Sequence, residues 1–376
     1  MKRILYIVFM FNFLFMSLTS ILPLLVFSLS NSSASSGYVM ATFMLALITV
    51  RVYLFYKYIP LKFLSRVGII SYCLGFLVLV MFSETMLSFY IGAVFLGMGV
   101  GIVVPILLTL LTKSATNRNG MINYHNILLA LASSTGPFIG MYLFDNLARQ
   151  QLYQILLYMG LSMVLVSLFL GKDPKQENTS MRGLNLKAIF LNKNYSVNFF
   201  VFFITSINYG CIIAYLPILL GIREMRIDFF YSIFWLCFAL AQIYTSKLAK
   251  RVNEKKLMYL FLLVLTICTA TLAIVGEYKF LIPIGGLFGF CYGALTNLFY
   301  NNIALIDEEK YKTDAFSIFG LMSYLGVGVA SFSLSPIAEY SLSLTFLLAA
   351  LFTLIIVCMF IIFNTISNNK RQRQRA

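Results

Sequence analysis

The sequence predicts an all-α integral membrane protein in which twelve transmembrane helices form two pseudo-symmetric six-helix bundles. Three observations lead to this prediction. The 376 residues are 60% hydrophobic and 11% charged, with a mean hydropathy of +0.89, whereas soluble globular domains carry about 25% charged residues. Twelve continuous apolar runs have the length of about 20 residues that a helix needs to cross the hydrocarbon core. A polar segment separates the first six runs from the last six.

The twelve apolar runs give the expected spans in order. The first six are residues 4–29, 38–56, 63–82, 86–112, 122–144 and 152–170, and the last six are residues 195–220, 229–246, 257–275, 280–303, 315–336 and 342–366. The first run follows two basic residues, as the core of a signal peptide would, but such a core has only about 7 to 15 residues. We therefore expect an uncleaved first span.

The predicted domains are an N-terminal bundle (residues 1–171), a cytoplasmic linker (172–194), a C-terminal bundle (195–366) and a basic cytoplasmic tail (367–376). Of the 28 Lys and Arg residues, 23 lie in segments on the side of the N-terminus, four lie on the other side, and Arg51 lies within a span. Cytoplasmic loops carry this excess of positive charge. We therefore expect a multi-pass protein of the cell (cytoplasmic) membrane with both termini in the cytoplasm, and no nucleic-acid binding.

The two halves of the sequence repeat several features. Both the fourth and the tenth span contain closely spaced glycines, namely Gly97, Gly99 and Gly101 in one and Gly285, Gly286, Gly289 and Gly293 in the other. The Gly136-Pro137 pair of the fifth span is paralleled by Ser335-Pro336 in the eleventh. Weak internal repetition is typical of transporters built from two six-helix halves.

A basic segment follows the second span of the second half and reads Ser246-Lys247-Leu248-Ala249-Lys250-Arg251-Val252-Asn253-Glu254-Lys255. It resembles the Gly-x-Leu-Ala-Asp-Arg-x-Gly-Arg-Lys loop of the major facilitator superfamily of secondary transporters. The matching residues are Leu248, Ala249, Arg251 and Lys255. The whole layout resembles this family. The resemblance implies transport of a small-molecule substrate by alternating access, with Arg251 and Lys255 in a conformational motif.

The fifth span contains a second motif, Gly136-Pro137-Phe138-Ile139-Gly140. It is similar to the Gly-x-x-x-Gly-Pro-x-x-Gly-Gly signature of exporters in this family, with Ala132 and Met141 in place of the outer glycines. Small residues let a neighbouring helix come close, and proline removes one backbone hydrogen bond. The resemblance implies outward transport, while a generic packing kink is the alternative.

The expected substrate site lies among the first, fourth, seventh and tenth spans, which line the central cavity in the fold of the resembled family. Polar residues recur in three of these spans at helical spacing: Asn12 and Thr19 in the first, Asn198, Thr205, Asn208 and Tyr209 in the seventh, and Asn297 and Tyr300 in the tenth. The alternative is that these side chains only join helices. Arg51 is the clear charge within a span, and it either binds an anionic group or extends along its helix to the cytoplasmic boundary.

The energy source is expected to be an ion gradient, of protons or sodium, since the sequence contains no phosphate-binding loop for ATP. His125, the single histidine, is the candidate proton carrier, or else a boundary residue. Asp145 and Arg149 are expected to form a local ion pair. No cofactor or metal is expected, and the protein is expected to be a monomer in the lipid bilayer.

The expected function is therefore secondary active transport of a small polar or amphipathic solute, most readily outward. Two alternatives stay open. One is a non-transporting sensor or assembly protein of the same fold. The other is a polytopic membrane transferase, which needs catalytic carboxylates or histidines at a membrane face, whereas the outer carboxylates of this sequence are scattered singly.

Overall fold

A computed structural model describes residues 2–57, 59–113, 118–170, 193–249, 251–304 and 309–373. The elements of this described part are all helices, and twelve of them are long and apolar enough to cross a membrane. The predicted all-α membrane fold is thus confirmed. The predicted linker at 172–194 lies outside the described residues as far as residue 192.

The helices follow the apolar runs closely, and most extend a few residues beyond them. The N-terminal half contains α1 (Lys2–Ser30), α2 (Ser33–Tyr56), α3 (Leu61–Met81), α4 (Met86–Lys113), α5 (Arg118–Asn146) and α6 (Arg149–Leu168). The C-terminal half contains α8 (Lys193–Ile222), α9 (Asp228–Leu248), α10 (Glu254–Leu272), α11 (Tyr278–Ala304), α12 (Glu309–Ser333), the short α13 (Ser335–Tyr340) and α14 (Leu342–Arg373). The last helix continues past the predicted end at residue 366.

Local sequence signals set several helix ends. The Ser32 hydroxyl accepts a hydrogen bond from the Ser35 backbone N–H and caps α2, and the Asn253 side chain caps α10 by accepting from Lys255. Such side-chain acceptors satisfy backbone N–H groups that have no partner inside the helix. The caps thus stabilise the starts of α2 and α10.

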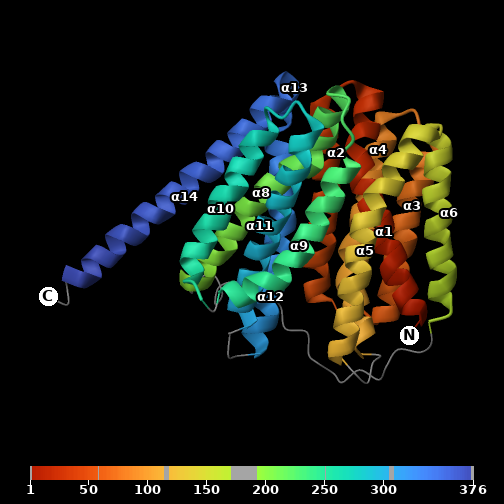
Figure 1. Cartoon of the computed structure of the whole chain (residues 1–376). Coiled ribbons are helices and arrows are strands. Elements are labelled where there is room, and N and C mark those ends of the chain that lie inside the picture. Colours follow the sequence, from red (N-terminus) through yellow and green to blue (C-terminus); the bar gives the residue numbers. More distant parts are fainter. Residues whose placement is uncertain are drawn as a thin grey trace.

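The two halves lie side by side, and α13 stands at one end of the assembly (Figure 1). We call this the α13 end; it also holds the turn between α1 and α2. The N-terminus lies at the opposite end, and α14 runs from α13 away from the α13 end (Figure 1).

The internal repeat is visible in how closely two helix pairs approach. A Cβ atom at Gly136 of α5 would lie 2.9 Å from the Phe13 carbonyl oxygen of α1, and one at Gly326 of α12 would lie 2.5 Å from the Phe203 carbonyl oxygen of α8. Only glycine permits such contacts. The structural counterpart of Gly136 is therefore Gly326. The expected parallel between Gly136-Pro137 and Ser335-Pro336 was wrong, because Pro336 lies in the first turn of α13, after α12 has ended.

The glycines of the fourth and tenth spans do serve equivalent contacts. In α4, Gly97 and Gly101 face the backbone of α2, and in α11, Gly289 and Gly293 face the backbone of α9. Each half thus packs by the same pattern of small residues against main chain, as is usual between membrane helices.

One connection between the halves is formed by α2 and α12. Near the α13 end, the rings of Tyr38 and Phe332 lie with their centroids 5.6 Å apart. Farther along, Met44 of α2 faces Gly328 of α12. The two helices still touch at Arg51, whose guanidinium reaches Tyr324 of α12. Contact along this pair extends from the α13 end to Arg51.

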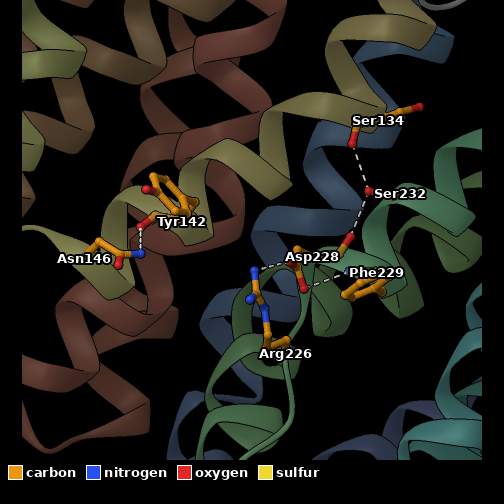
Figure 2. A network of polar contacts seen from close by, with 7 residues as sticks. All are labelled: Ser134, Tyr142, Asn146, Arg226, Asp228, Phe229 and Ser232. Carbon is orange, nitrogen blue, oxygen red and sulfur yellow. Dashed lines mark hydrogen bonds and ion pairs between the residues drawn. The ribbon is translucent and has the colours of Figure 1, made fainter.

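The second connection between the halves joins α5 and α9. The Ser232 hydroxyl of α9 donates a hydrogen bond of 2.8 Å to the Ser134 carbonyl of α5, which Figure 2 shows. Phe138 and Phe229 pack edge to face with their centroids 5.0 Å apart. These contacts involve the start of α9, which follows directly on the loop from α8 at the α13 end.

Candidate functional site

Arg51 lies between the two halves of the protein. Its Nε donates to the Gly101 carbonyl of α4 at 3.3 Å, and one terminal nitrogen donates to the Tyr324 hydroxyl of α12 at 3.4 Å. The guanidinium carbon also stands 4.6 Å from the centre of the Tyr324 ring, within the range of a cation–π interaction. The side chain is half-buried. These contacts favour a position inside the helix assembly over extension along α2 toward Lys57.

Aromatic side chains of the C-terminal half lie beside this position. Tyr209 of α8 stacks on Tyr292 of α11 with centroids 4.8 Å apart, and Trp235 of α9 lies 6.4 Å from Tyr209. Tyr324 is close enough to interact electrostatically with Tyr209 and Tyr292. We call these four residues, Tyr209, Trp235, Tyr292 and Tyr324, the aromatic wall.

Tyr300 extends this aromatic group toward the end of α11. Its ring lies 4.8 Å from Phe319 and 5.5 Å from Phe316 of α12, and its side chain is exposed. Both Arg51 and Tyr324 lie within electrostatic range of its hydroxyl. The structure therefore brings together three of the expected site residues, Arg51, Tyr209 and Tyr300.

The expected amide and hydroxyl residues have partners within the helices. Asn12 donates to the Val8 carbonyl and Thr19 to the Met16 carbonyl, both within α1. Asn297 donates to Gln242 of α9 at 3.1 Å and accepts from Asn301. In these contacts the side chains join helix turns or neighbouring helices.

Asn208 is a different case, because it is completely buried in the C-terminal half. Its amide nitrogen donates to the Thr353 hydroxyl of α14 at 2.6 Å and to the Ile204 carbonyl at 3.2 Å. Within the described part of the chain, the amide oxygen has no hydrogen-bond partner. The structure thus places Asn208 between α8 and α14, away from the aromatic wall of its neighbour Tyr209.

The exporter-like motif lies where α5 crosses α1. The Ser17 hydroxyl of α1 donates to the Gly136 carbonyl at 2.8 Å, and a Cβ at Gly140 would lie 2.9 Å from the Ser17 carbonyl oxygen. Pro137 is buried and offers no N–H to the helix. These residues shape a helix crossing within the N-terminal half and do not touch Arg51.

The remaining candidates lie near the end opposite α13. Arg251 is exposed in the connection from α9 to α10, and Lys255 is exposed in the first turn of α10. The ion pairs of the described residues include neither of them. His125 is half-buried, and its ring contacts the Asn126 side chain at 3.4 Å. Within the described residues, no group of three His, Cys, Asp or Glu side chains is placed to hold a metal ion.

Two carboxylates at the α13 end have contacts that the sequence did not reveal. Asp228, at the start of α9, is fully buried and accepts hydrogen bonds from Arg226 at 2.6 Å and from the Phe229 backbone at 3.0 Å (Figure 2). The bond to Asp228 raises the pKa of Arg226 above its ordinary value. A cation two residues before an acid in the first helical turn was the available signal.

The second carboxylate, Glu339 of α13, joins the two halves. It accepts hydrogen bonds from the Ser32 hydroxyl at 2.8 Å and from the Ala34 backbone at 2.9 Å, and so caps the N-terminus of α2 from the other half.

The expected ion pair of Asp145 with Arg149 was wrong. Arg149 instead donates to Ser28, and Asp145 lies in the electrostatic range of Arg226 and Asp228.

Comparisons with known proteins agree with this architecture. The chain is similar to the nucleoside transporter NupG, with 14% sequence identity, a TM-score of 0.79 and coverage of 96% of this chain and 98% of that chain. The human organic anion transporter MFSD10 (TETRAN) shows 12% identity and a TM-score of 0.65, with 95% and 97% covered. A POT family transporter in complex with a thioalcohol conjugated peptide shows 11% identity and a TM-score of 0.76, with 97% and 96% covered.

At these identities the solved structures show the fold. No match is found among curated protein sequences. The family model described as Major Facilitator Superfamily matches residues 4–331 and, in an overlapping second match, residues 198–376. Together the two matches cover almost the whole sequence, so the chain belongs to the major facilitator superfamily.

Proposed function

We propose that the protein is a secondary active transporter that exports a small polar or amphipathic solute. The observation that carries this proposal is the position of Arg51. A half-buried cation stands between two six-helix halves, where residues of both halves reach it. Charges within membrane spans are costly, and they mark substrate or ion pathways when they face the interior.

Alternating access would move the two halves against each other around this position. The contacts of α2 with α12 and of α5 with α9 support this mechanism, because they join the halves from the α13 end as far as Arg51. We propose that the α13 end faces the outside and that this conformation opens to the cytoplasm. The positive charge in the segments at the opposite end supports this orientation.

Several finer features belong to the same proposal. The exporter-like residues Gly136, Pro137 and Gly140 support the outward direction. A proton or sodium gradient would supply the energy, with His125 as the proton candidate. The protein would act as a monomer in the cell membrane, with both termini in the cytoplasm. The linker at 172–194 would join the two bundles, and Arg251 and Lys255 would act in their relative motion.

The test is a comparison of metabolites in cells that have or lack the protein, measured inside the cells and in the medium by untargeted mass spectrometry. Export predicts that one compound accumulates inside and disappears from the medium when the gene is deleted. The cells are then complemented with wild type, with Arg51→Gln, or with Arg149→Gln as a matched control. Arg149 donates to Ser28 at the α13 end, so this control removes an arginine away from the proposed site.

We expect wild type and Arg149→Gln to restore the compound to the medium, while Arg51→Gln reaches the membrane but does not. Restoration by Arg51→Gln would overturn the site assignment. An opposite change on deletion would establish import. If no compound changes, the sensor or assembly role gains support, and a new covalent product without any movement of solute would point to the transferase.

A further inference from the structure

We propose that the site at Arg51 selects aromatic molecules with a single negative charge, with the acidic group on Arg51 and the ring on the aromatic wall. The inference rests on the proposed transport function and names its substrate class. It follows from three properties of the site: the unused hydrogen-bonding capacity of Arg51, the lack of an acidic partner, and the chemistry of the wall.

Arg51 uses its donors less fully than Arg66 and Arg223, the two arginines that bind several carbonyls. Arg66 donates to three carbonyls at the C-terminal end of α6, the nearest at 3.1 Å. Arg223 donates to three carbonyls at the C-terminal end of α10 and just after it, one of them at 2.7 Å, and also to Ser343. Arg51 makes two long hydrogen bonds, of 3.3 and 3.4 Å. Since a guanidinium has five N–H donors in a planar fork, Arg51 keeps capacity for a planar acceptor.

No carboxylate pairs with Arg51 among the described residues. The spans of this sequence contain no central Asp or Glu that could neutralise it. Arg51 lies inside the spanning helix α2 (Ser33–Tyr56), and the comparable arginine of α3, Arg66, already binds carbonyls at the end of α6. One uncompensated cation favours a ligand with one negative charge, and a second charge would be buried without a partner.

The opposite side of the site consists of flat rings. Tyr209 and Tyr292 form a stack, Trp235 meets Tyr209 edge to face, and the Tyr324 ring lies under the Arg51 guanidinium. Aromatic rings gain energy from stacked and edge contacts beyond the burial of area. The Tyr324 hydroxyl and the Tyr300 side chain add polar groups at the rim. Tyr209, Trp235 and Tyr324 are half-buried, whereas Tyr292 is buried. The C-terminal half thus offers three partly exposed rings to an aromatic body, while the N-terminal half supplies the charge.

Trp235 is the single tryptophan of the chain, so intrinsic tryptophan fluorescence reports directly on the aromatic wall. Binding to the purified full-length protein in lipid nanodiscs is measured by this signal and by calorimetry. Four probes are compared: trans-cinnamate, its neutral analogue cinnamyl alcohol, the saturated acid 3-cyclohexylpropanoate, and 4-carboxycinnamate, which carries a second charge.

We expect trans-cinnamate to change Trp235 fluorescence and to bind at least about tenfold more tightly than cinnamyl alcohol, because a hydrogen bond to a charged group is worth about that factor. It should bind about two- to tenfold more tightly than 3-cyclohexylpropanoate, because contacts between aromatic rings are worth about that factor. It should also bind more tightly than 4-carboxycinnamate, whose second charge would be buried without a partner. Arg51→Gln should remove the preference for cinnamate over its alcohol. Arg51→Lys should retain part of it, since it keeps the charge without the planar fork. The control Arg149→Gln should bind like wild type.

Each other outcome counts against the inference in a defined way. If cinnamyl alcohol binds as tightly as cinnamate, the site does not select for a negative charge. If 3-cyclohexylpropanoate binds as tightly as cinnamate, the site does not select for an aromatic ring. Equal binding of 4-carboxycinnamate would overturn the restriction to one charge. If none of the probes binds while the deletion still removes a compound from the medium, the substrate class is wrong and the transport function stands.

Discussion

At the scale of single residues, Arg51 and Asn208 show what a sequence can and cannot reveal about a membrane site. Arg51 could be recognised from the sequence as a candidate site residue, because a charge within a membrane span is energetically costly. Asn208 and Tyr209 are neighbours in sequence, yet one is buried against α14 and the other stacks in the aromatic wall. Successive residues of a helix point about 100° apart, and the sequence does not state which direction faces the site.

The contact between Asn208 and Thr353 leads to a prediction about stability. Thr353→Val leaves the Asn208 amide nitrogen without its partner on α14, and an unsatisfied buried donor costs about 1–3 kcal/mol. The double variant Asn208→Leu/Thr353→Val removes both polar groups. In a double-mutant cycle of thermal unfolding in detergent, we expect a coupling energy of about 1 kcal/mol between the two positions.

The same variants separate a structural role from a role in transport. We expect the double variant to keep substantial transport, in contrast to Arg51→Gln, because its side chains are buried within one half. A coupling energy of zero would mean that the contact does not stabilise α8 against α14. If the double variant folds stably but does not transport, Asn208 must be assigned to the substrate site after all.

At the scale of helices, the close crossings of α1 with α5 and of α8 with α12 define the repeated unit. The sequence suggested the repeat through glycines and predicted helix number and approximate bounds well. The comparison of the two halves paired Gly136 with Ser335, because it matched residues that precede a proline and could not use the contacts between helices. Gly326 has no proline beside it, and only the distance to Phe203 identifies it as the counterpart.

These crossings predict the effect of added volume. In Gly136→Leu, the first added atom would already lie 2.9 Å from the Phe13 carbonyl oxygen, and forcing extra volume into a packed contact costs about 1–3 kcal/mol. Gly276→Leu is the control, since a Cβ there would meet no atom within 4 Å. We expect Gly136→Leu to insert into the membrane but to lose transport and melting temperature, and Gly276→Leu to behave like wild type.

Gly326→Leu should reproduce the defect of Gly136→Leu if the two crossings are equivalent. Transport by each variant is compared after its amount in the membrane has been measured. Normal transport and stability in both variants would show that α1 and α5, and likewise α8 and α12, can separate without consequence, and the packing argument would then fail.

At the scale of the whole molecule, the α13 end joins the halves through contacts that could not be predicted from the sequence. Glu339 of α13 lies more than 300 positions from Ser32, and its role as a cap of α2 depends on the approach of the two bundles. Helix existence follows from local apolar runs, and orientation follows from charge counts. Contacts between distant helices depend on the three-dimensional arrangement, so these carboxylates remained unrecognised.

The Glu339 contact predicts a change in exposure at the α13 end. Glu339→Gln weakens the interaction of a negative charge with the N-terminus of α2, an effect worth about a two- to fivefold shift in an equilibrium. Ser36, which is buried against α8, is changed to Cys as a reporter. We expect Glu339→Gln to speed maleimide modification at position 36 about two- to fivefold, measured by peptide mass spectrometry.

Glu277→Gln provides the control for the Glu339 variant, since Glu277 pairs with Lys279 within the C-terminal half. Equal modification rates in both variants would mean that Glu339 does not hold this end closed. A membrane-impermeant maleimide applied to intact cells tests the orientation at the same time. Reaction at position 36 under those conditions places the α13 end outside the cell.

The last prediction concerns the relative motion of the two halves at the contact between α5 and α9. Ser134→Cys and Ser232→Cys place thiols on α5 and α9, where the two halves meet, and a short cleavable bismaleimide would hold this contact closed. The control joins Ser71→Cys of α3 to Phe95→Cys of α4, which contact each other within the N-terminal half. If the halves must separate here in each cycle, cross-linking α5 to α9 stops transport and cleavage of the linker restores it, whereas the control cross-link leaves transport largely intact. Transport that continues with α5 fully cross-linked to α9 would exclude separation of these helices as a step of the cycle, and the solute would then have to pass while the α13 end stays closed.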